Sequence, residues 1–209
     1  MPSLYIMPKL HKMRSMDSLI VGRPIAACHS WVTTYASIWL ADMLNSCLKD
    51  YPTVLTDRTQ FVRELEGLHV NENAWLLTVD VDSLYPHVEH KGCIEACSEA
   101  VPGNSTVKFM VGSFLQFVLK NNVVSVQGRQ YKQIFGGAMG TNCMPPAAQI
   151  YLARTWEGLA KQRMGAAFPK VFKRFIDDGF VVFEGSEQEL LSFVNMLNTL
   201  LPDIKITYS

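Results

Sequence analysis

The chain has 209 residues, 48% of them hydrophobic, which is enough for one compact domain with its own core and argues against a globally disordered protein. Its 19 basic and 19 acidic residues balance to zero, so the total charge does not indicate a nucleic-acid-binding protein, although residues 1–24 hold four basic residues against one acid. No apolar run is long enough to cross a bilayer, and the N-terminus lacks a signal-peptide core, so we expect an intracellular protein.

Apolar spacing, cap residues and turn residues define the predicted elements. In chain order they are extended segments at 4–7 and 22–25, helices over 33–48 and 57–65, a strand over 75–81, helices over 89–100 and 105–120, a hairpin of 123–126 with 129–131, a helix over 146–163, a hairpin around 171–183, a helix over 186–200 and a strand over 203–208. This order indicates an α+β fold, in which an antiparallel sheet backed by helices presents acids on its open side.

Two of the predicted strands, far apart in the chain, end in aspartates. The run 75–81 contains Asp80 and leads to Asp82, while Asp177 and Asp178 lie between apolar runs whose turn is predicted at Asp178-Gly179. Two such strands can bring their carboxylates together at one end of a sheet, where oxygen ligands bind Mg²⁺ and two ions can clamp a phosphoryl transfer. Either element alone is more typical of a surface turn, but together they favour a metal site. The role of Asp82 is left undecided. The two-residue strand period would point its side chain to the same face as Asp80, but Asp82 is equally consistent with a turn cap.

Other segments allow two interpretations. Glycines within 135–141 would let the backbone approach a phosphate or base pair, or would only form a tight connection before a helix; no P-loop lysine follows. Lys9, Lys12 and Arg23 either bind a triphosphate or are solvated surface charges. Tyr85 either packs in the core or forms the floor of a nucleotide pocket.

Four candidate zinc ligands lie within one short stretch of the chain. Candidate ligands are His87, His90, Cys93 and Cys97. A single helix cannot surround a tetrahedral ion with all four, so we expect no zinc site and incidental thiols on a helix face. The odd, scattered set of five cysteines fits reduced thiols better than a disulfide framework.

Together these segments resemble a reverse transcriptase, specifically the Penelope-like retroelement group, akin to telomerase catalytic subunits. The matching segments are Tyr5-Ile6-Met7-Pro8-Lys9-Leu10-His11-Lys12, Gly22-Arg23-Pro24-Ile25, Asp80-Val81-Asp82-Ser83-Leu84-Tyr85-Pro86, Gly137-Ala138-Met139-Gly140-Thr141 with Pro145, Phe175-Ile176-Asp177-Asp178, and Lys205. In the same order they resemble the group's leucine-proline-lysine-isoleucine-histidine-lysine signature, its fingers element, its first aspartate motif, its template-and-nucleotide helix motif, its aromatic-x-Asp-Asp box and its late palm lysine. Each segment is weak alone, but the ordered match over nearly the whole chain is highly specific.

The resemblance implies a right-hand polymerase palm with partial fingers and no thumb, because the chain stops soon after Lys205. The implied parts are fingers elements in 1–74, the palm with its first aspartate motif in 75–100, a helix and hairpin insertion in 101–135, and the remaining palm in 136–209.

The resemblance also implies roles for individual residues. Asp80, Asp177 and the Val81 backbone carbonyl would bind two Mg²⁺ ions, or Mn²⁺, with Asp178 assisting. The implied nucleotide-binding residues are Lys9, Lys12, Arg23, Tyr85, Met139, Gly140 and Lys205. Tyr85 would lie under the sugar and exclude a ribose 2′-OH.

The implied reaction is attack of a primer 3′-OH on a dNTP, with an RNA template and a DNA primer as partners. We also expect a partner that supplies a thumb, or a second copy of the chain. The expected location is nuclear, and no membrane is expected as a partner. Two alternatives remain: a catalytically inactive retroelement-derived protein that binds nucleic acid, and an RNA-dependent RNA polymerase. The latter usually carries glycine before the paired aspartates and a smaller residue in place of Tyr85.

Overall fold

The computed structural model describes residues 1–8 and 22–209, so the predictions for Lys9 and Lys12 lie outside the described residues. The described strands are β1 (Leu4–Pro8), β2 (Gly22–Ala26), β3 (Ala74–Val81), β4 (Val123–Val126), β5 (Arg129–Lys132), β6 (Val171–Phe175), β7 (Asp178–Glu184) and β8 (Ile206–Tyr208). The α-helices are α1 (Thr34–Cys47), α2 (Arg58–Glu66), α3 (His90–Ala100), α4 (Ser105–Lys120), α5 (Met144–Tyr151), α6 (Gly158–Met164) and α7 (Glu187–Leu200). A π-helical segment, Leu152–Glu157, joins α5 to α6, and 3-10 turns lie at Cys28–Ser30, Leu48–Asp50, Tyr85–His87 and Gly165–Ala167. The mixture of helices and antiparallel sheet confirms the α+β prediction.

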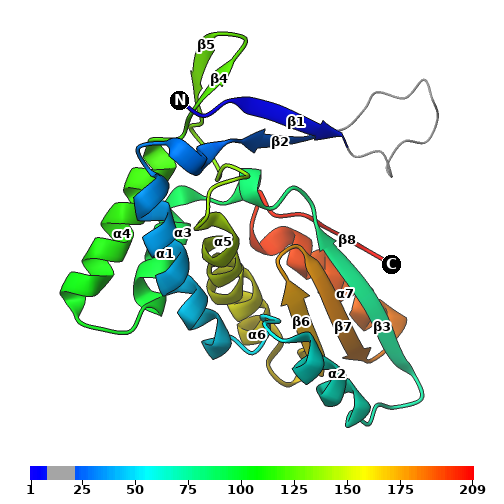
Figure 1. Cartoon of the computed structure of the whole chain (residues 1–209). Helices are drawn as coiled ribbons and strands as arrows, with labels where there is room; N and C mark the ends of the chain where they lie inside the picture. The colour runs from blue at the N-terminus through cyan, green and yellow to red at the C-terminus, as the bar shows by residue number, and fades with distance from the viewer. Residues whose placement is uncertain (9–21) are drawn as a thin grey trace, which may run out of the picture.

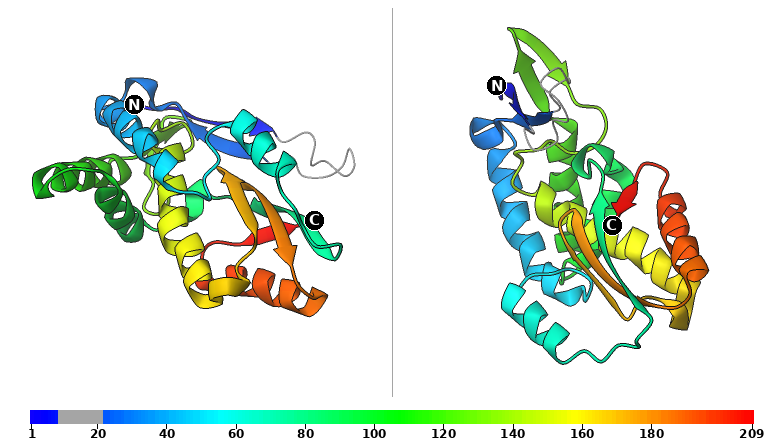
Figure 2. Two further views of the ribbon diagram at one scale, coloured as in Figure 1. Left: turned by 90° about the horizontal axis from the view of Figure 1, so that it is seen from below. Right: turned by 90° about the vertical axis from the view of Figure 1, so that its right-hand side faces the viewer.

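The central element is a four-stranded antiparallel sheet with strand order β6-β7-β3-β8 (Figure 1). Alternate residues of β3, such as Leu77 and Val79, are buried, as the two-residue strand period requires. α7 and α2 lie on opposite faces of this sheet (Figure 2). On the α7 side Phe183 stacks on Phe193, and on the α2 side the ring centroids of Phe61 and Phe180 lie 5.7 Å apart.

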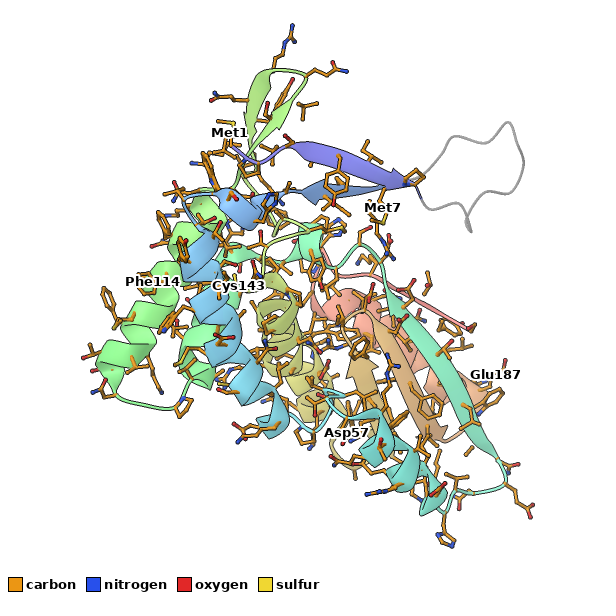
Figure 3. The ribbon with its side chains drawn as sticks, viewed as in Figure 1. Met1, Met7, Asp57, Phe114, Cys143 and Glu187 are labelled. Atoms are coloured by element: carbon orange, nitrogen blue, oxygen red, sulfur yellow. The ribbon has the colours of Figure 1, made fainter. Side chains whose placement is uncertain are left out.

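The cap residues begin the helices where the sequence predicts. Asp57, labelled in Figure 3, accepts hydrogen bonds from the backbone N–H groups of Thr59 and Gln60 at the start of α2. Asn104 caps α4, and Ser186 with Glu189 forms a capping box at the start of α7. The predicted helices over 33–48, 57–65, 89–100 and 105–120 are confirmed within one residue at each end.

Two predicted boundaries differ from the structure. The helix predicted over 146–163 begins earlier, at Met144, because a proline in the first helical turn lacks only an N–H group that would have no partner there. The strand predicted over 203–208 is limited to Ile206–Tyr208, where it pairs with β3.

The turn predicted at Asp178-Gly179 is wrong. The turn consists of Ile176 and Asp177, and Asp178 is already the first residue of β7. The register explains the difference, because Asp178 and Gly179 are paired with β3 as well as with β6. An Asp-Gly pair favours a turn locally, but here two neighbouring strands hold it in the sheet.

The five cysteines, Cys28, Cys47, Cys93, Cys97 and Cys143, are free thiols and all are buried. Figure 3 shows Cys143 among the helices that make the core. Within residues 1–8 and 22–209, no helix combines the length and the apolar character needed to span a bilayer.

Two smaller antiparallel pairs, β1–β2 and β4–β5, lie beyond the four-stranded sheet (Figure 1). They contact each other through Ser3 and Ser125. β2 approaches residues 135–141, the glycine-rich loop, through a bridge between Ile25 and Met139. The β1–β2 pair therefore connects the projecting β4–β5 hairpin with the end of the main sheet that carries the aspartates.

Candidate active site

A cleft of about 610 Å³ opens where β3 ends beside the β6–β7 turn, and we call it the acid cleft. Its lining residues are Arg23, Ile25, Asp80, Val81, Asp82, Ser83, Leu84, Tyr85, Met139, Gly140, Ile176, Asp177 and Asp178. The structure thus brings together the predicted acids from two distant segments, the predicted cation of β2, the aromatic residue and the glycine-rich loop. It also places Asp82 at the cleft, which the sequence left open.

Backbone pairing holds the acids at the end of β3. Asp80 lies directly opposite Asp178 in the β3–β7 register. The Val81 N–H donates to the Asp177 carbonyl at 2.9 Å, and the Asp82 N–H donates to the Lys205 carbonyl at 2.8 Å. The end of β3 is therefore fixed from both sides, which limits the freedom of the acid-bearing segments.

Two strained residues border the acids. Ser83, with φ of 49°, follows Asp82, and Ile176, with φ of 59°, precedes Asp177. A β-branched residue in the left-handed region is a genuine outlier, and such conformations cost on the order of 1–3 kcal/mol each. Because backbone strain of this kind is common at functional sites, it supports the acid cleft as the candidate active site.

The acid cleft has a negative local charge. Burial, followed by the neighbouring charges of Asp177 and Asp80, raises the pKa of Asp178, and only the Arg23 guanidinium opposes this. Burial and then the Asp177 charge raise the pKa of Tyr85 to about 12, so its phenol stays protonated at neutral pH. Like charges opposite one another destabilise a strand pair, so a bound cation would relieve this repulsion.

The oxygen atoms of the acids fit a hard cation, although the side chains are not arranged close enough to surround one. Among the described residues, no group of three or more His, Cys, Asp or Glu side chains has metal-binding proximity. Asp80 and Asp178 nevertheless lie opposite each other on the neighbouring strands β3 and β7, and Asp177 is adjacent to Asp178. An all-oxygen set suits Mg²⁺ or Mn²⁺.

Glycine at position 140 is required by the protein backbone itself. A Cβ there would lie 2.2 Å from the Ala26 carbonyl oxygen, and φ is +106°. The Ala26 N–H donates to the Met139 carbonyl at 2.8 Å, so β2 packs directly on this loop. Met139 and Gly140 consequently form one wall of the acid cleft, beside Arg23.

Among the predicted site residues that the structure describes, Lys205 is the one that does not line the acid cleft. Its Nζ donates to the Asn198 carbonyl near the end of α7 at 2.6 Å. Its backbone carbonyl still holds Asp82, as described above. A lysine in the predicted place along the chain therefore directs its charge elsewhere, because the end of a helix offers it free carbonyl groups.

Arg174 supports the site from outside the acid cleft, a role that the sequence did not predict. Its side chain is 1% exposed, and its Nε pairs with Glu157 Oε1 at 2.5 Å. Nη1 donates to the Ile176 carbonyl at 2.7 Å and Nη2 to the Gln149 carbonyl at 3.1 Å. The guanidinium therefore ties the strained turn of Ile176 and Asp177, which we call the acid turn, to the helical segment that carries Gln149 and Glu157. The only signal in the sequence was an arginine inside an apolar strand pattern.

The predicted zinc candidates have other contacts. His90 Nε2 lies 2.7 Å from the Gly136 carbonyl oxygen, and its ring stacks on Phe135. Cys93 and Cys97 are fully buried, with their sulfur atoms near the Ala147 carbonyl. These residues connect α3 with the glycine-rich loop and with α5.

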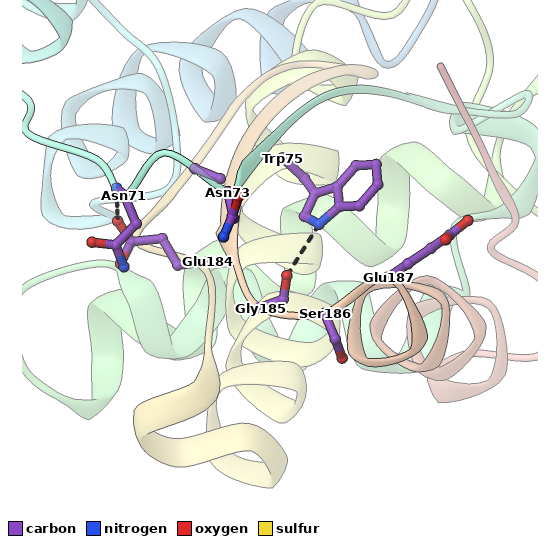
Figure 4. Close-up of a pocket in the computed structure, with 8 residues that line it drawn as sticks. Asn71, Asn73, Trp75, Glu184, Gly185, Ser186 and Glu187 are labelled. Atoms are coloured by element: carbon purple, nitrogen blue, oxygen red, sulfur yellow. Dashed lines mark hydrogen bonds between the residues drawn. The ribbon is translucent and has the colours of Figure 1, made fainter.

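A larger open hollow of about 800 Å³ lies at the opposite end of β3 (Figure 4). There Trp75 Nε1 donates to the Gly185 carbonyl at 3.0 Å, and the Asn71 N–H donates to Glu184 at 3.1 Å. Glu184 also pairs with Lys170. Trp75 and Glu184 are already engaged in these bonds, whereas acids from two distant segments meet in the acid cleft, which is therefore the better candidate for chemistry.

No protein-family model matches the sequence, and no curated protein is detectably similar to it. Solved structures do share its fold. Telomerase from Candida albicans, in complex with the TWJ fragment of telomeric RNA, has a TM-score of 0.67 over 100% of this chain at 10% identity. Telomerase from Candida tropicalis has a TM-score of 0.65 over 99% of this chain at 10% identity.

The RNA-dependent RNA polymerase of BmCPV at its elongation state has a TM-score of 0.66 over 100% of this chain, also at 10% identity. This chain spans 42%, 43% and 20% of those three proteins, respectively. The predicted fold is confirmed: an antiparallel sheet backed by helices, as in the palm of nucleic-acid polymerases.

Proposed function

We propose that this protein is an RNA-directed DNA polymerase of the Penelope-like retroelement group, and that the acid cleft is its catalytic centre. The observation that carries the proposal is the meeting of Asp80, Asp177 and Asp178 with Arg23 and Tyr85 in one cleft on a polymerase fold. RNA template, DNA primer and dNTPs are the partners this function requires. A partner or second copy that grips the duplex, and a nuclear location, belong to the same proposal.

Each residue of the acid cleft has a proposed role in binding metal, triphosphate or template. Asp80, Asp177 and the Val81 carbonyl would hold Mg²⁺, with Asp178 assisting. When bound, the ions neutralise charge on the attacking and leaving oxygens of the phosphoryl transfer. Arg23 offers a guanidinium fork to the triphosphate, and Met139 with Gly140 forms the wall along which the template–nucleotide pair would lie. Positioning and charge neutralisation, rather than a protein nucleophile, supply the catalysis.

The direct test is extension of a labelled DNA primer on an RNA template with dNTPs and Mg²⁺. Extension that EDTA abolishes would support the proposal. Binding of primer–template without any extension would favour the alternative of a retroelement-derived protein that only binds nucleic acid.

Replacing Asp178 with asparagine is expected to stabilise the metal-free protein. The native fold raises the pKa of Asp178, so it binds the proton more tightly than the unfolded chain does, and stability falls as pH rises through that raised pKa. Removing one of two facing charges contributes up to about 1 kcal/mol, or roughly 3 °C in melting temperature. Thermal unfolding in EDTA at neutral pH measures this, and the gain should disappear below the ordinary pKa of aspartate.

The same variant tests the metal proposal without any activity assay. Mg²⁺ should raise the melting temperature of the wild type and raise that of Asp178→Asn less, because the variant has lost a ligand charge. Asp203→Asn, an exposed residue outside the acid cleft, is the matched control. An equal response of all three proteins to Mg²⁺ would contradict the proposed ligand set.

Replacing Tyr85 with alanine is expected to admit ribonucleotides. Tyr85 lines the acid cleft and is partly buried, with its carbonyl fixed by the Gly137 N–H at 2.8 Å. Removing the ring would open space beside the sugar of the incoming nucleotide, so the preference for dNTP over rNTP should fall at least about tenfold. Single-nucleotide extension with each substrate measures it, and Tyr85→Phe should keep the preference. Unchanged rejection of rNTPs by Tyr85→Ala would show that another group excludes the 2′-OH.

An RNA-dependent RNA polymerase is the second candidate. The BmCPV enzyme matches the fold about as well as the telomerases do. Tyr85 favours DNA synthesis, because the RNA polymerases usually carry a smaller residue at that place. A wild-type preference for rNTPs over dNTPs would decide for this candidate.

A further inference from the structure

The charges of this neutral chain are strongly segregated. No Asp or Glu occurs between Glu99 and Glu157, although the whole chain has 19 acids. The basic residues in that section are Lys108, Lys120, Arg129, Lys132 and Arg154. A section with this composition is locally basic even though the total is zero, and local basic surfaces attract nucleic-acid phosphates.

The β4–β5 hairpin is the most exposed part of this section. It projects away from the four-stranded sheet (Figures 1 and 2). Every residue of β5 is exposed, and neither Arg129 nor Lys132 takes part in an ion pair within the described part of the chain. Tyr131 lies between them and is 50% exposed.

The hairpin is held at its base and along β4. At its base the Gln133 N–H donates to the Asn122 carbonyl at 2.9 Å, and the two side chains bond at 2.6 Å. On its β4 side the Ser125 N–H donates to the Pro2 carbonyl at 2.8 Å. The cations and the tyrosine are therefore carried by a supported platform.

A short segment of the chain leads from the hairpin to the acid cleft. After β5 come Ile134, which is 85% exposed, and Phe135, which is 41% exposed. The following Gly137 is bound to the Tyr85 carbonyl, and Met139 already lines the acid cleft. Two cations, two exposed rings and a lining residue of the acid cleft thus follow one another within residues 129–139 of the chain.

We propose that the β4–β5 hairpin, with Phe135, docks the single-stranded part of the template outside the acid cleft. Arg129 and Lys132 contact backbone phosphates, and Tyr131 and Phe135 offer rings on which bases stack without sequence preference. This inference rests on the proposed polymerase function. The alternative is that the cations only protect the free edge of β5 from pairing with another chain.

The test is binding of a short fluorescent single-stranded RNA to the full chain, measured by anisotropy between about 50 and 200 mM salt. The Arg129→Gln/Lys132→Gln variant should bind roughly tenfold more weakly. The slope of log affinity against log salt should fall by roughly 1.4, because each phosphate contact on a single strand contributes about 0.7. Tyr131→Ala should weaken binding roughly tenfold while leaving the slope unchanged. A single-stranded DNA of the same sequence shows whether the surface distinguishes the sugar.

Lys161→Gln/Arg163→Gln, which removes two exposed cations from α6, is the matched control. Equal weakening by this control, or wild-type affinity and slope in the hairpin variant, would overturn the inference. A change of oligomeric state in the hairpin variant with unaltered RNA binding would overturn it in favour of edge protection.

The outcome is separable from that of the proposed function. If the wild type extends primers but the hairpin variant binds like the wild type, only the docking surface is refuted. If RNA binding depends on the hairpin but no nucleotide is ever added, only the polymerase proposal is refuted.

Discussion

Asp177→Ala is expected to lower the rate of Mg²⁺-dependent primer extension by at least about a thousandfold. Asp177 lies in the β6–β7 turn, beside Asp178 and near the end of β3. When bound, the proposed ions would supply several kcal/mol of transition-state stabilisation, and each 1.36 kcal/mol is tenfold in rate, so losing one proposed ligand would remove about three powers of ten. Single-turnover extension at saturating dNTP measures the chemical step.

The fold should survive this substitution, because the backbone carbonyl of Asp177, which holds Val81, is retained. Asp203→Ala removes a carboxylate outside the acid cleft and should extend primers like the wild type. Turnover of Asp177→Ala at the wild-type rate would show that the acids of this cleft do not hold catalytic metal. Primer–template binding by Asp177→Ala at near wild-type affinity would locate the defect in the reaction rather than in binding.

Arg174→Lys is expected to destabilise the protein by about 3–5 kcal/mol, because a lysine ammonium cannot reproduce the three bonds of the guanidinium and leaves the buried Glu157 without its hydrogen-bond partner. Glu157 is 2% exposed, and its Oε2 already has no hydrogen-bond partner. Lysine cannot replace the three directional donors of the guanidinium. For a chain of this size the melting temperature should fall by roughly 10 °C. Thermal and denaturant unfolding both measure it, with the exposed Arg163→Lys as control.

A double variant separates the structural role of Arg174 from its effect on the acid turn. Arg174→Met/Glu157→Leu replaces the buried ion pair with apolar groups and should regain much of the lost stability. It cannot hold the Ile176 carbonyl, so extension should stay at least about tenfold below the wild type, since small displacements of catalytic groups are costly. Full recovery of extension in the stable double variant would show that Arg174 serves folding alone.

The sequence by itself determined the local structure of this protein. The helix starts at Asp57, Asn104 and Ser186 follow from side chains that accept bonds from backbone groups two or three residues away, so no distant contact is needed. The convergence of Asp80 with the paired aspartates was also predictable, because two apolar strands ending in acids tend to share one end of a sheet.

The tertiary structure decided the details of the site. The acid turn lies at Ile176 and Asp177, and not at the predicted Asp178-Gly179, because β3 pairs with Asp178 and Gly179. This strand register depends on residues about a hundred positions away in the chain. The same holds for Lys205, which bonds to a carbonyl near the end of α7, and for Arg174, which bonds to a helical segment and to the acid turn. Hydrogen bonds between distant segments exist only after the chain has packed, so local patterns can place an acid on a strand but cannot show what holds it there.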